Sequence, residues 1–588
     1  MKRRKNLERA VILGLLLSTS VYGSAWAETE EINHITDSFN GEYSTSVIVK
    51  NDSNTSAIEI NDKEVSITTT NSEDGIITLE SGKYGIRLEG ESNVILTAAQ
   101  DNKIIVDLGS EDDADGINAV NGASGKINLI ANGSNIITTT GVGTDGIYTD
   151  KGNNTEILLN AANDNHNNEI YTGNNGIDHR GNNKVTLTAK GGNIIDAGNA
   201  YTTAEGDGIR IEGNGNIELN AQYNKITASD EGLYIHNNSA ENVEIELIAS
   251  GTDENGYGNY INANDNGIEI TKGAANVTAN AGANYVYGEK NAVYNHGSGA
   301  ITISATAGTG DEGISTLANY EDYNNELVGG INGVQSDSTG TTNVIADNNN
   351  IIAGTENGIL SDGAGTITVT AGNNNTIGQY TDESGKVITS ENGIYVTKGT
   401  VNVTAENGNN NIYANNSGIY LLDDTEINVT AENGNININN ESGSGVGANT
   451  NANINLSAGN DIIINSVATS GIAAADNNGI FTKGANSNIT AGGNMFIMAV
   501  ADKSASGLES SVEVSNPAAT LNIDVEKILS IYAEGERAYG ISLAGLESSE
   551  INAAESIYVT AVGKNDFDTY AYHTSGISSK LISDGDIN

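Results

Sequence analysis

The chain of 588 residues contains no cysteine, one proline and one tryptophan. Without cysteine, no disulfide can stabilise the fold and no thiol can serve as a nucleophile or a metal ligand. Arginine is also scarce, and after residue 27 only Arg87, Arg180, Arg210 and Arg537 remain. The stabilising interactions must therefore come from packing and hydrogen bonding rather than from covalent cross-links.

Positive charge is in short supply as a whole. The sequence has 76 acidic and 27 basic side chains, which gives a formal net charge of −49. A surface of this kind repels nucleic acids and anionic lipids, so we expect no nucleic-acid partner. Disorder is not expected either, because the sequence is rich in short runs of valine and isoleucine.

The N-terminus has the features of a secretory signal. A basic stretch from Lys2 to Lys5 precedes a short apolar segment, Val11 to Leu17, and the tripeptide Ala25-Trp26-Ala27 fits a cleavage site. We predict a signal peptide over residues 1–27, a mature chain that begins at Glu28, and an extracellular or outer-membrane surface location. A buried N-terminal helix is the alternative. No later segment has 18 uninterrupted apolar residues, so no transmembrane helix is expected.

One phrase recurs along the chain, an alternation of apolar and polar residues that ends in alanine. Its copies begin at Val94, Ile127, Ile157, Val185, Ile217, Ile367, Val401, Ile427 and Ile454. Strict alternation is typical of a β-strand with one buried and one wet face. A second phrase, Asn, Asp or Ser followed by Gly-Ile, precedes the copies, as in Asp145-Gly146-Ile147 and Asn392-Gly393-Ile394. We expect its glycine to supply a positive φ at a tight corner.

A third phrase, with Asn before an apolar pair, follows the alanine, as at Asn193 and Asn411. Three short strands per unit, repeating every 25 residues from Gly393 to Gly418 and every 26 from Gly445 to Gly471, predict a right-handed, three-faced parallel β-helix of about 20 coils. We expect residues 28–60 to form an N-terminal cap region and residues 61–588 to form the β-helix repeats.

Two other all-β architectures are alternatives to the β-helix. An antiparallel sandwich also has short alternating strands, but it does not repeat one three-part phrase over hundreds of residues. A propeller needs four strands per blade and a longer period. The β-helix explains the repeats better than either.

The N-terminal signal, the repeats rich in Asn, Gly and Thr, and the lack of cysteine resemble the passenger domains of type V autotransporters, the adhesin-like class of Gram-negative bacteria. The resemblance implies a C-terminal membrane β-barrel, which this sequence is expected to lack because its tryptophan is Trp26 and it has 4 phenylalanines. We expect a truncated passenger, with membrane attachment only through the missing barrel.

Few residues point to catalysis. The triplet Asp178-His179-Arg180 places a carboxylate beside a base, as a hydrolytic site could use, yet we expect a solvated strand face there. The histidines are isolated, and neither H-E-x-x-H nor G-x-S-x-G occurs. We therefore expect no enzyme activity and no cofactor.

The densest acidic cluster contains Asp112, Asp113 and Asp115. Carboxylate oxygens are ligands that Ca²⁺ prefers, so these residues are a weak candidate for a calcium site. They lack the spacing of an EF-hand loop, and an acidic solvated loop is the alternative.

Tyrosine is the one enriched aromatic, and Tyr148, Tyr395 and Tyr420 each follow Gly-Ile. If the isoleucine points inward, the tyrosine points outward and is available to sugar rings or a protein. We expect a secreted or surface-displayed adhesin-like rod that binds a host glycan or surface protein or associates with itself. A β-helix polysaccharide lyase or hydrolase is the alternative.

Overall fold

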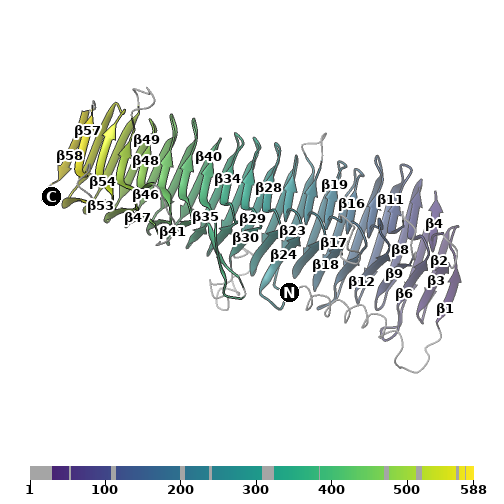
Figure 1. Cartoon of the computed structure of the whole chain (residues 1–588). Helices are drawn as coiled ribbons and strands as arrows, with labels where there is room; N and C mark the ends of the chain where they lie inside the picture. The colour runs from purple at the N-terminus through teal and green to yellow at the C-terminus, as the bar shows by residue number, and fades with distance from the viewer. Residues whose placement is uncertain are drawn as a thin grey trace.

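The computed structural model describes residues 29–51, 55–107, 114–198, 206–236, 242–306, 323–382, 384–468, 476–511, 519–564, 569–575, 578–583 and 585–588. Within these residues the chain forms 58 strands and no helix. The strands stack into a long rod, with the N-terminal coils at one end and the C-terminal coils at the other (Figure 1). The predicted signal peptide lies outside the described residues.

Three parallel sheets, which we call A, B and C, form the faces of the rod. Sheet A runs from β1 (Glu30–Asn33) to β56 (Ser556–Gly563) and has 19 strands. Sheet B runs from β4 (Ile58–Asn61) to β57 (Thr569–Ser575), and sheet C runs from β2 (Phe39–Tyr43) to β58 (Ser578–Ser583). Each coil contributes one strand to each sheet, so the predicted three-faced parallel β-helix is confirmed.

The three sequence phrases correspond to the three sheets. The phrase ending in alanine forms sheet C, where Ala371 pairs with Ala405 and Ala405 with Ala431. The Gly-Ile phrase forms sheet B, and the Asn phrase forms sheet A. Alternate side chains point inward, so Val401 and Val403 are fully buried whereas Asn402 is half-buried on the outside. The predicted inside–outside register of sheet C is thus confirmed.

The spacing prediction fails at one coil. We expected Gly471 to follow Gly445 in the stack, but the partner of Val446 in the next coil is Ile480, which follows Gly479. The 34 residues from Gly445 to Gly479 accommodate an insertion at the A–B corner, part of which, with Gly471, lies outside the described residues. A fixed period cannot reveal such an insertion, because the inserted segment itself contains Gly-Ile.

A continuous row of asparagines runs inside the rod along sheet A. Each side chain except the last donates through Nδ2 to the Oδ1 of the next coil at 2.8–2.9 Å, and most also donate to a backbone carbonyl. The row, which we call the asparagine ladder, consists of Asn102, Asn135, Asn168, Asn193, Asn224, Asn259, Asn284, Asn325, Asn350, Asn375 and Asn410. These buried amides are therefore satisfied by one another and by nearby backbone carbonyls.

The corner glycines of sheet B serve a different purpose from the one expected. Gly146, Gly176, Gly208, Gly393 and Gly418 are not among the residues with positive φ, so that expectation is wrong. Instead, a Cβ atom on Gly418 would lie 2.3 Å from Cγ2 of Ile438 and 2.7 Å from the carbonyl oxygen of Gly445. Glycine is required because backbone and sheet A isoleucine approach each other closely there.

The predicted cap region already contains regular strands. In residues 28–60, β1 pairs in parallel with β3 (Val47–Asn51), and β2 pairs with β5 (Glu64–Thr69). Phe39 and Tyr43 occupy inward positions of β2 and pack against the core. The first coil thus follows the common register and presents aromatic side chains at the end of the core.

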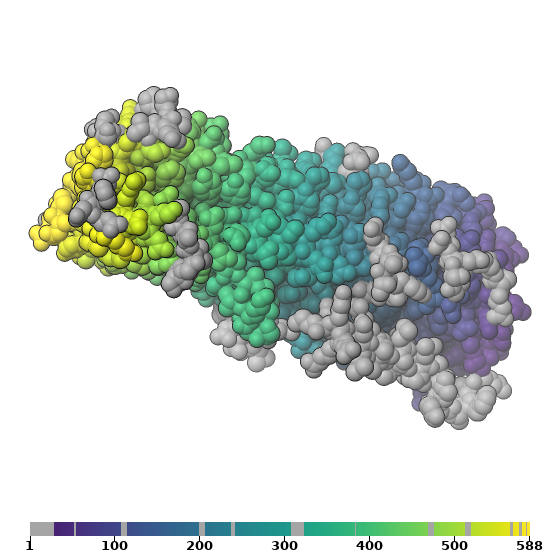
Figure 2. All heavy atoms as spheres, in the orientation of Figure 1, coloured from purple at the N-terminus to yellow at the C-terminus, as the bar shows by residue number. Residues whose placement is uncertain are grey.

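One antiparallel hairpin interrupts the stack within the described ranges. β37 (Gln379–Thr381) and β38 (Val387–Thr389) are inserted between β36 (Asn375–Ile377) of sheet A and β39 (Asn392–Val396) of sheet B. The carboxylate of Asp382 accepts hydrogen bonds from the backbone N–H groups of Ser384 and Lys386, both at 2.9 Å, and so closes the turn. The hairpin projects from the middle of the rod (Figures 1 and 2).

Candidate functional site

Ionisable and aromatic side chains gather on the outer face of sheet B. The strands involved are β13 (Ile147–Thr149), β16 (Ile177–His179), β19 (Ile209–Ile211), β22 (Leu233–Ile235), β25 (Ile268–Ile270) and β28 (Asn291–Asn295). Their central outward positions form one row across six coils, namely Tyr148, Asp178, Arg210, Tyr234, Glu269 and Tyr294. We call this region the sheet B cluster.

The triplet Asp178-His179-Arg180 does not form one site. Asp178 faces outward and is bound by Arg180, whose Nη2 lies 2.7 Å from Oδ2. His179 points into the core, where Nδ1 lies 2.7 Å from Thr149 Oγ1 and Nε2 lies 2.6 Å from the carbonyl oxygen of Asn183. Burial lowers the pKa of His179 to about 4, so the ring is neutral at pH 7. Asp178 and His179 are therefore buried, contrary to the solvated strand face that we expected.

In several coils, an acidic residue also stands directly before the glycine of the Gly-Ile phrase, at the corner where the chain enters sheet B. In later coils this corner carries asparagines, and Asn357 donates to Asn332 at 2.8 Å. In earlier coils, the carboxylate of Asp145 accepts from the backbone N–H of Asn175 at 3.0 Å, and that of Asp207 accepts from Glu231 at 3.2 Å. The acids thus continue a structural ladder in which a side-chain oxygen binds the next coil.

Two of these corner acids interact directly. Burial raises the pKa of Asp207 to about 7 and that of Glu231 to about 8, and their carboxyl groups are hydrogen-bonded to each other. The two carboxyl groups therefore titrate as a pair, with one proton shared between them. Oxygen atoms of Asp207, Asp230 and Glu231 lie within 4.8 Å of one another. Within the described part of the chain, these three residues form a group that could hold a metal ion.

The predicted calcium cluster can be followed only in part. Asp112 and Asp113 lie outside the described residues. Asp115 is buried on β10 (Asp115–Ala119), where Oδ2 accepts from Asn118 Nδ2 at 2.5 Å and Oδ1 accepts from the backbone N–H of Asp145 at 3.1 Å. Both oxygens of Asp115 therefore already have donors within the coil stack.

The three tyrosines that follow Gly-Ile point outward, as their positions predicted. Ile147, Ile394 and Ile419 are fully buried, and the tyrosine after each is half-buried on the outer face. Tyr395 and Tyr420 lie on neighbouring coils with ring centroids 5.8 Å apart. The ring of Tyr148 instead lies under the guanidinium of Arg180, at 5.4 Å.

The outer face of sheet C changes character along the rod. In two neighbouring coils, one of its two central outward positions carries a glutamate, Glu218 on β20 (Ile217–Ala221) and Glu246 on β23 (Glu244–Ala249). Over eight later coils its two central outward positions are uncharged, a stretch that we call the neutral face. It consists of Asn276, Thr278, Thr302, Ser304, Asn343, Ile345, Thr368, Thr370, Asn402, Thr404, Asn428, Thr430, Asn455, Ser457, Asn488 and Thr490.

Side chains of the neutral face bind one another along the rod. Asn428 Nδ2 donates to Asn402 Oδ1, and Asn455 Nδ2 donates to Asn428 Oδ1, both at 2.8 Å. A shallow hollow at the C-terminal end of this stretch is lined by Asn455, Asn488 and Asn522. The result is a flat array of hydroxyl and amide groups with donors and acceptors on every coil.

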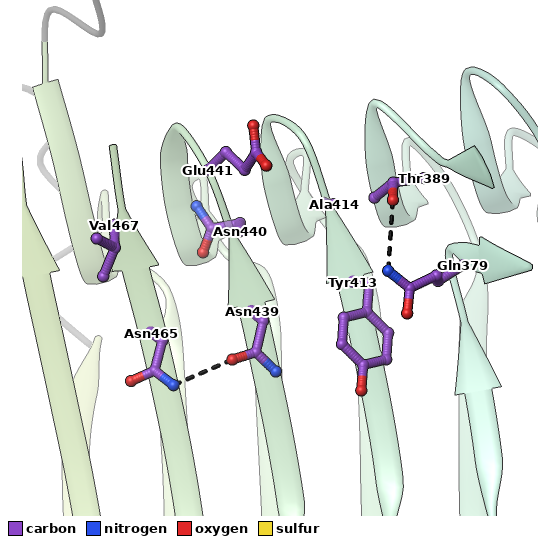
Figure 3. Close-up of a pocket in the computed structure, with 9 residues that line it drawn as sticks. All are labelled: Gln379, Thr389, Tyr413, Ala414, Asn439, Asn440, Glu441, Asn465 and Val467. Atoms are coloured by element: carbon purple, nitrogen blue, oxygen red, sulfur yellow. Dashed lines mark hydrogen bonds between the residues drawn. The ribbon is translucent and has the colours of Figure 1, made fainter. Parts of the chain in front are cut away.

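Two hollows flank the hairpin on sheet A. One, of about 220 Å³, is lined by Gln379 and Thr389 of the hairpin and by Tyr413, Asn439 and Asn465 of successive coils (Figure 3). The other, of about 310 Å³, is lined on the opposite side by Glu326, Ile351, Thr376, Gln379, Tyr380 and Thr381, together with Asp382. Gln379 lines both, so the hairpin divides one stretch of sheet A into two pockets.

Sequence reasoning missed the hairpin and the sheet B acids. Their signals were present: Asp382 and Gly385 mark a turn between short β-prone segments, and Asp or Glu stands in the corner before glycine in several coils. The convergence of those acids depends on the register between coils, which the variable spacing hides.

No helix in the described ranges is long and apolar enough to cross a membrane. No family model, no curated protein and no solved structure matches the sequence or the fold of this chain.

Proposed function

We propose that this protein is a non-catalytic adhesive rod, exported and displayed or released by a bacterium, that binds a host glycan or surface protein or a second copy of itself. The neutral face of sheet C carries the proposal. A chain with a net charge of −49 repels most anionic surfaces, yet this stretch has no charge at sixteen central positions. At these positions a partner meets no like charge, and the carboxylate of Glu426 lies at the edge of the face beside Asn428.

The repetition of the face supports binding over catalysis. Each coil offers the same small set of hydroxyl and amide groups, each of which makes weak contacts. Many such contacts add through effective concentration when the partner is also repetitive, as a polysaccharide or a second rod is. The basic and then apolar N-terminal sequence supports export by the same signal that we predicted above.

Charges introduced into the neutral face test the proposal. Thr370 and Thr404 occupy equivalent outward positions on β35 (Thr366–Ala371) and β40 (Thr400–Ala405). We expect the double variant T370K/T404K to lower adhesion to host cells, or association between rods, by at least tenfold (~1.4 kcal/mol). N220K/I248K, at the equivalent positions of the neighbouring strands β20 and β23 beside Glu218 and Glu246, is the matched control and should adhere normally. Equal adhesion by both variants would contradict the proposal.

A polysaccharide lyase or hydrolase is the second candidate, because Asp207 and Glu231 come from neighbouring coils and share a proton. A pair with one protonated and one ionised carboxyl is what glycoside hydrolysis uses. Incubation with a panel of polysaccharides should yield no new reducing ends and no unsaturated products. Product formation that is abolished by D207N and by E231Q would replace the adhesive proposal with this one.

A further inference from the structure

The larger pocket beside the hairpin has the chemistry of a ligand site. Its floor is the outer face of sheet A, where Glu326, Ile351 and Thr376 lie on consecutive coils, and its wall is the strand β37. Its volume of about 310 Å³ lies at the lower end of ligand pockets, which span roughly 300–1,000 Å³. The pocket can therefore hold a small ring but not a bulky group.

Glu326 is the unusual group in this pocket. Its side chain is half-buried, and among the described residues it has no hydrogen-bond or ion-pair partner. Burial alone raises the pKa of this carboxyl. The second carboxylate, that of Asp382, is occupied by the hairpin turn. A half-buried carboxylate without a counter-ion is costly, and a bound cation would remove that cost.

The rest of the lining excludes an anion and favours an amphipathic ring. Neither pocket beside the hairpin is lined by lysine or arginine. Tyr380 lines the wall, and Tyr285 lies directly beside Glu326 on the preceding coil, stacked on Tyr260 with ring centroids 5.1 Å apart. Aromatic faces attract both cations and the C–H face of a sugar.

We propose that this pocket binds an amino sugar with a free ammonium group, as part of a longer glycan. Glu326 pairs with the ammonium group, the ring of Tyr380 packs against the sugar, and Thr376 and Gln379 bind its hydroxyl groups. The proposal rests on the proposed function only in treating the rod as a binding protein, since the pocket lies on a different face.

A glycan fits better than a lysine side chain of a protein. A lysine needs one carboxylate and an aromatic slot, whereas this lining is rich in hydroxyl and amide groups. Gln379 also joins the pocket to the second one, where Tyr413, Asn439 and Asn465 follow one another along the rod axis (Figure 3). Neighbouring sugar units of one chain can occupy these positions in turn.

The test uses the full chain and a hexamer of glucosamine, with affinity measured by calorimetry. We expect E326Q to weaken binding at least tenfold, because it removes the charge and keeps the shape. Glu169 is the matched control, since it lies in the same outward row of sheet A but is hydrogen-bonded to Tyr171 and Asn167. E169Q should bind like the parent chain, and circular dichroism should show that both variants are folded.

Two further measurements separate the proposal from its rivals. Below the pH at which the amino groups of the sugar are fully protonated, affinity should fall as the solution is acidified further, because Glu326 takes up a proton while the amino sugar stays charged. The N-acetylated hexamer should bind at least tenfold more weakly than the glucosamine hexamer. Equal binding of the two hexamers, no effect of E326Q, or tighter binding of a lysine-rich peptide would overturn the proposal.

The sheet C variants keep this inference distinct from the adhesive function. If T370K/T404K loses adhesion and still binds the glucosamine hexamer, both proposals stand. If T370K/T404K adheres normally and E326Q loses the hexamer, the pocket is right and the adhesive face is wrong. If E326Q binds normally and T370K/T404K loses adhesion, the pocket is wrong and the adhesive face is right.

Discussion

At the scale of single residues, the asparagine ladder is the feature that alternation could not reveal. In the phrase Asn193-Ile194-Ile195, the sequence predicts a strand with a polar residue at its start. The structure buries Asn193 completely and turns Ile194 outward. A buried asparagine is favourable only when the neighbouring coil provides a second asparagine to bind its amide. The ladder can therefore be recognised only after the sequences of successive coils have been aligned.

The middle of the ladder should be more sensitive than its end. In N224I, Asn259 Oδ1 and the carbonyl oxygen of Ile248 lose their donor, and Asn193 Nδ2 loses an acceptor. We expect a loss of about 2–4 kcal/mol, from the cost of leaving buried polar groups without partners. Native-state hydrogen exchange of the flanking coils measures it, because a long solenoid does not unfold in one step.

The end of the ladder provides the matched control for that substitution. Asn410 already faces Ile436 in the following coil, so N410I removes fewer hydrogen bonds. We expect N410I to cost less than N224I. Equal losses in the two variants would show that the side-chain hydrogen bonds between coils contribute little to stability.

At the scale of the elements, the sequence predicted the strands correctly but gave the wrong role to the glycines at the corners between them. The three phrases correctly located sheets A, B and C because each phrase repeats with its own alternation. The corner glycines were expected to adopt positive φ. Glycine is needed there for another reason, because a Cβ atom would clash with the neighbouring coil. Contacts of this kind involve residues about one coil apart, and no local pattern encodes them.

A single methyl group should therefore disturb a corner. In G418A, the added Cβ would meet Ile438 and the backbone of Gly445, so we expect a loss of about 1–3 kcal/mol from overpacking. Ala292 occupies the equivalent corner of β28 and shows that one coil has adapted to a methyl group. A292G should lose only about 0.5–1 kcal/mol. Thermal or chemical unfolding of both variants, followed by hydrogen exchange at the two corners, measures the difference. A G418A variant as stable as the parent chain would show that the corner can relax.

At the scale of the whole molecule, the rod is built from interchangeable coils, and its binding should depend on how many remain. Deleting residues 350–374 removes one coil of the neutral face and brings Asn375 into the place of Asn350 beside Asn325. Because each coil contacts only its neighbours, the shortened rod should fold. We expect adhesion to decline stepwise as such coils are removed, as measured by retention on host cells.

Deletion of residues 193–223 is the matched control, since it removes the coil that carries Glu218 on sheet C and brings Asn224 into the place of Asn193. This variant should adhere like the parent chain. Complete loss of adhesion after removal of any one coil would point instead to a single discrete site, of the kind an enzyme has.

The candidate sites also differ in how far the sequence alone could predict them. The outward tyrosines followed from alternation alone, whereas the neutral face and the sheet B cluster depend on which coils are neighbours. The hairpin pocket could not be predicted at all, because Glu326, Thr376 and Tyr380 meet only through the insertion of β37 and β38 into the stack.

The amide dipoles of the asparagine ladder also share one orientation along the rod axis. In each of its ten hydrogen bonds the amide of one coil donates to the amide of the next coil toward the C-terminus, so the ten hydrogen bonds are aligned. At the N-terminal end, Asn102 Oδ1 has no donor, since Ile77 precedes it in the stack. Rotating one amide by half a turn would set two oxygens and two NH₂ groups against each other. The eleven dipoles must therefore reverse together or not at all, and the interior of the rod is polar in the way a helix axis is.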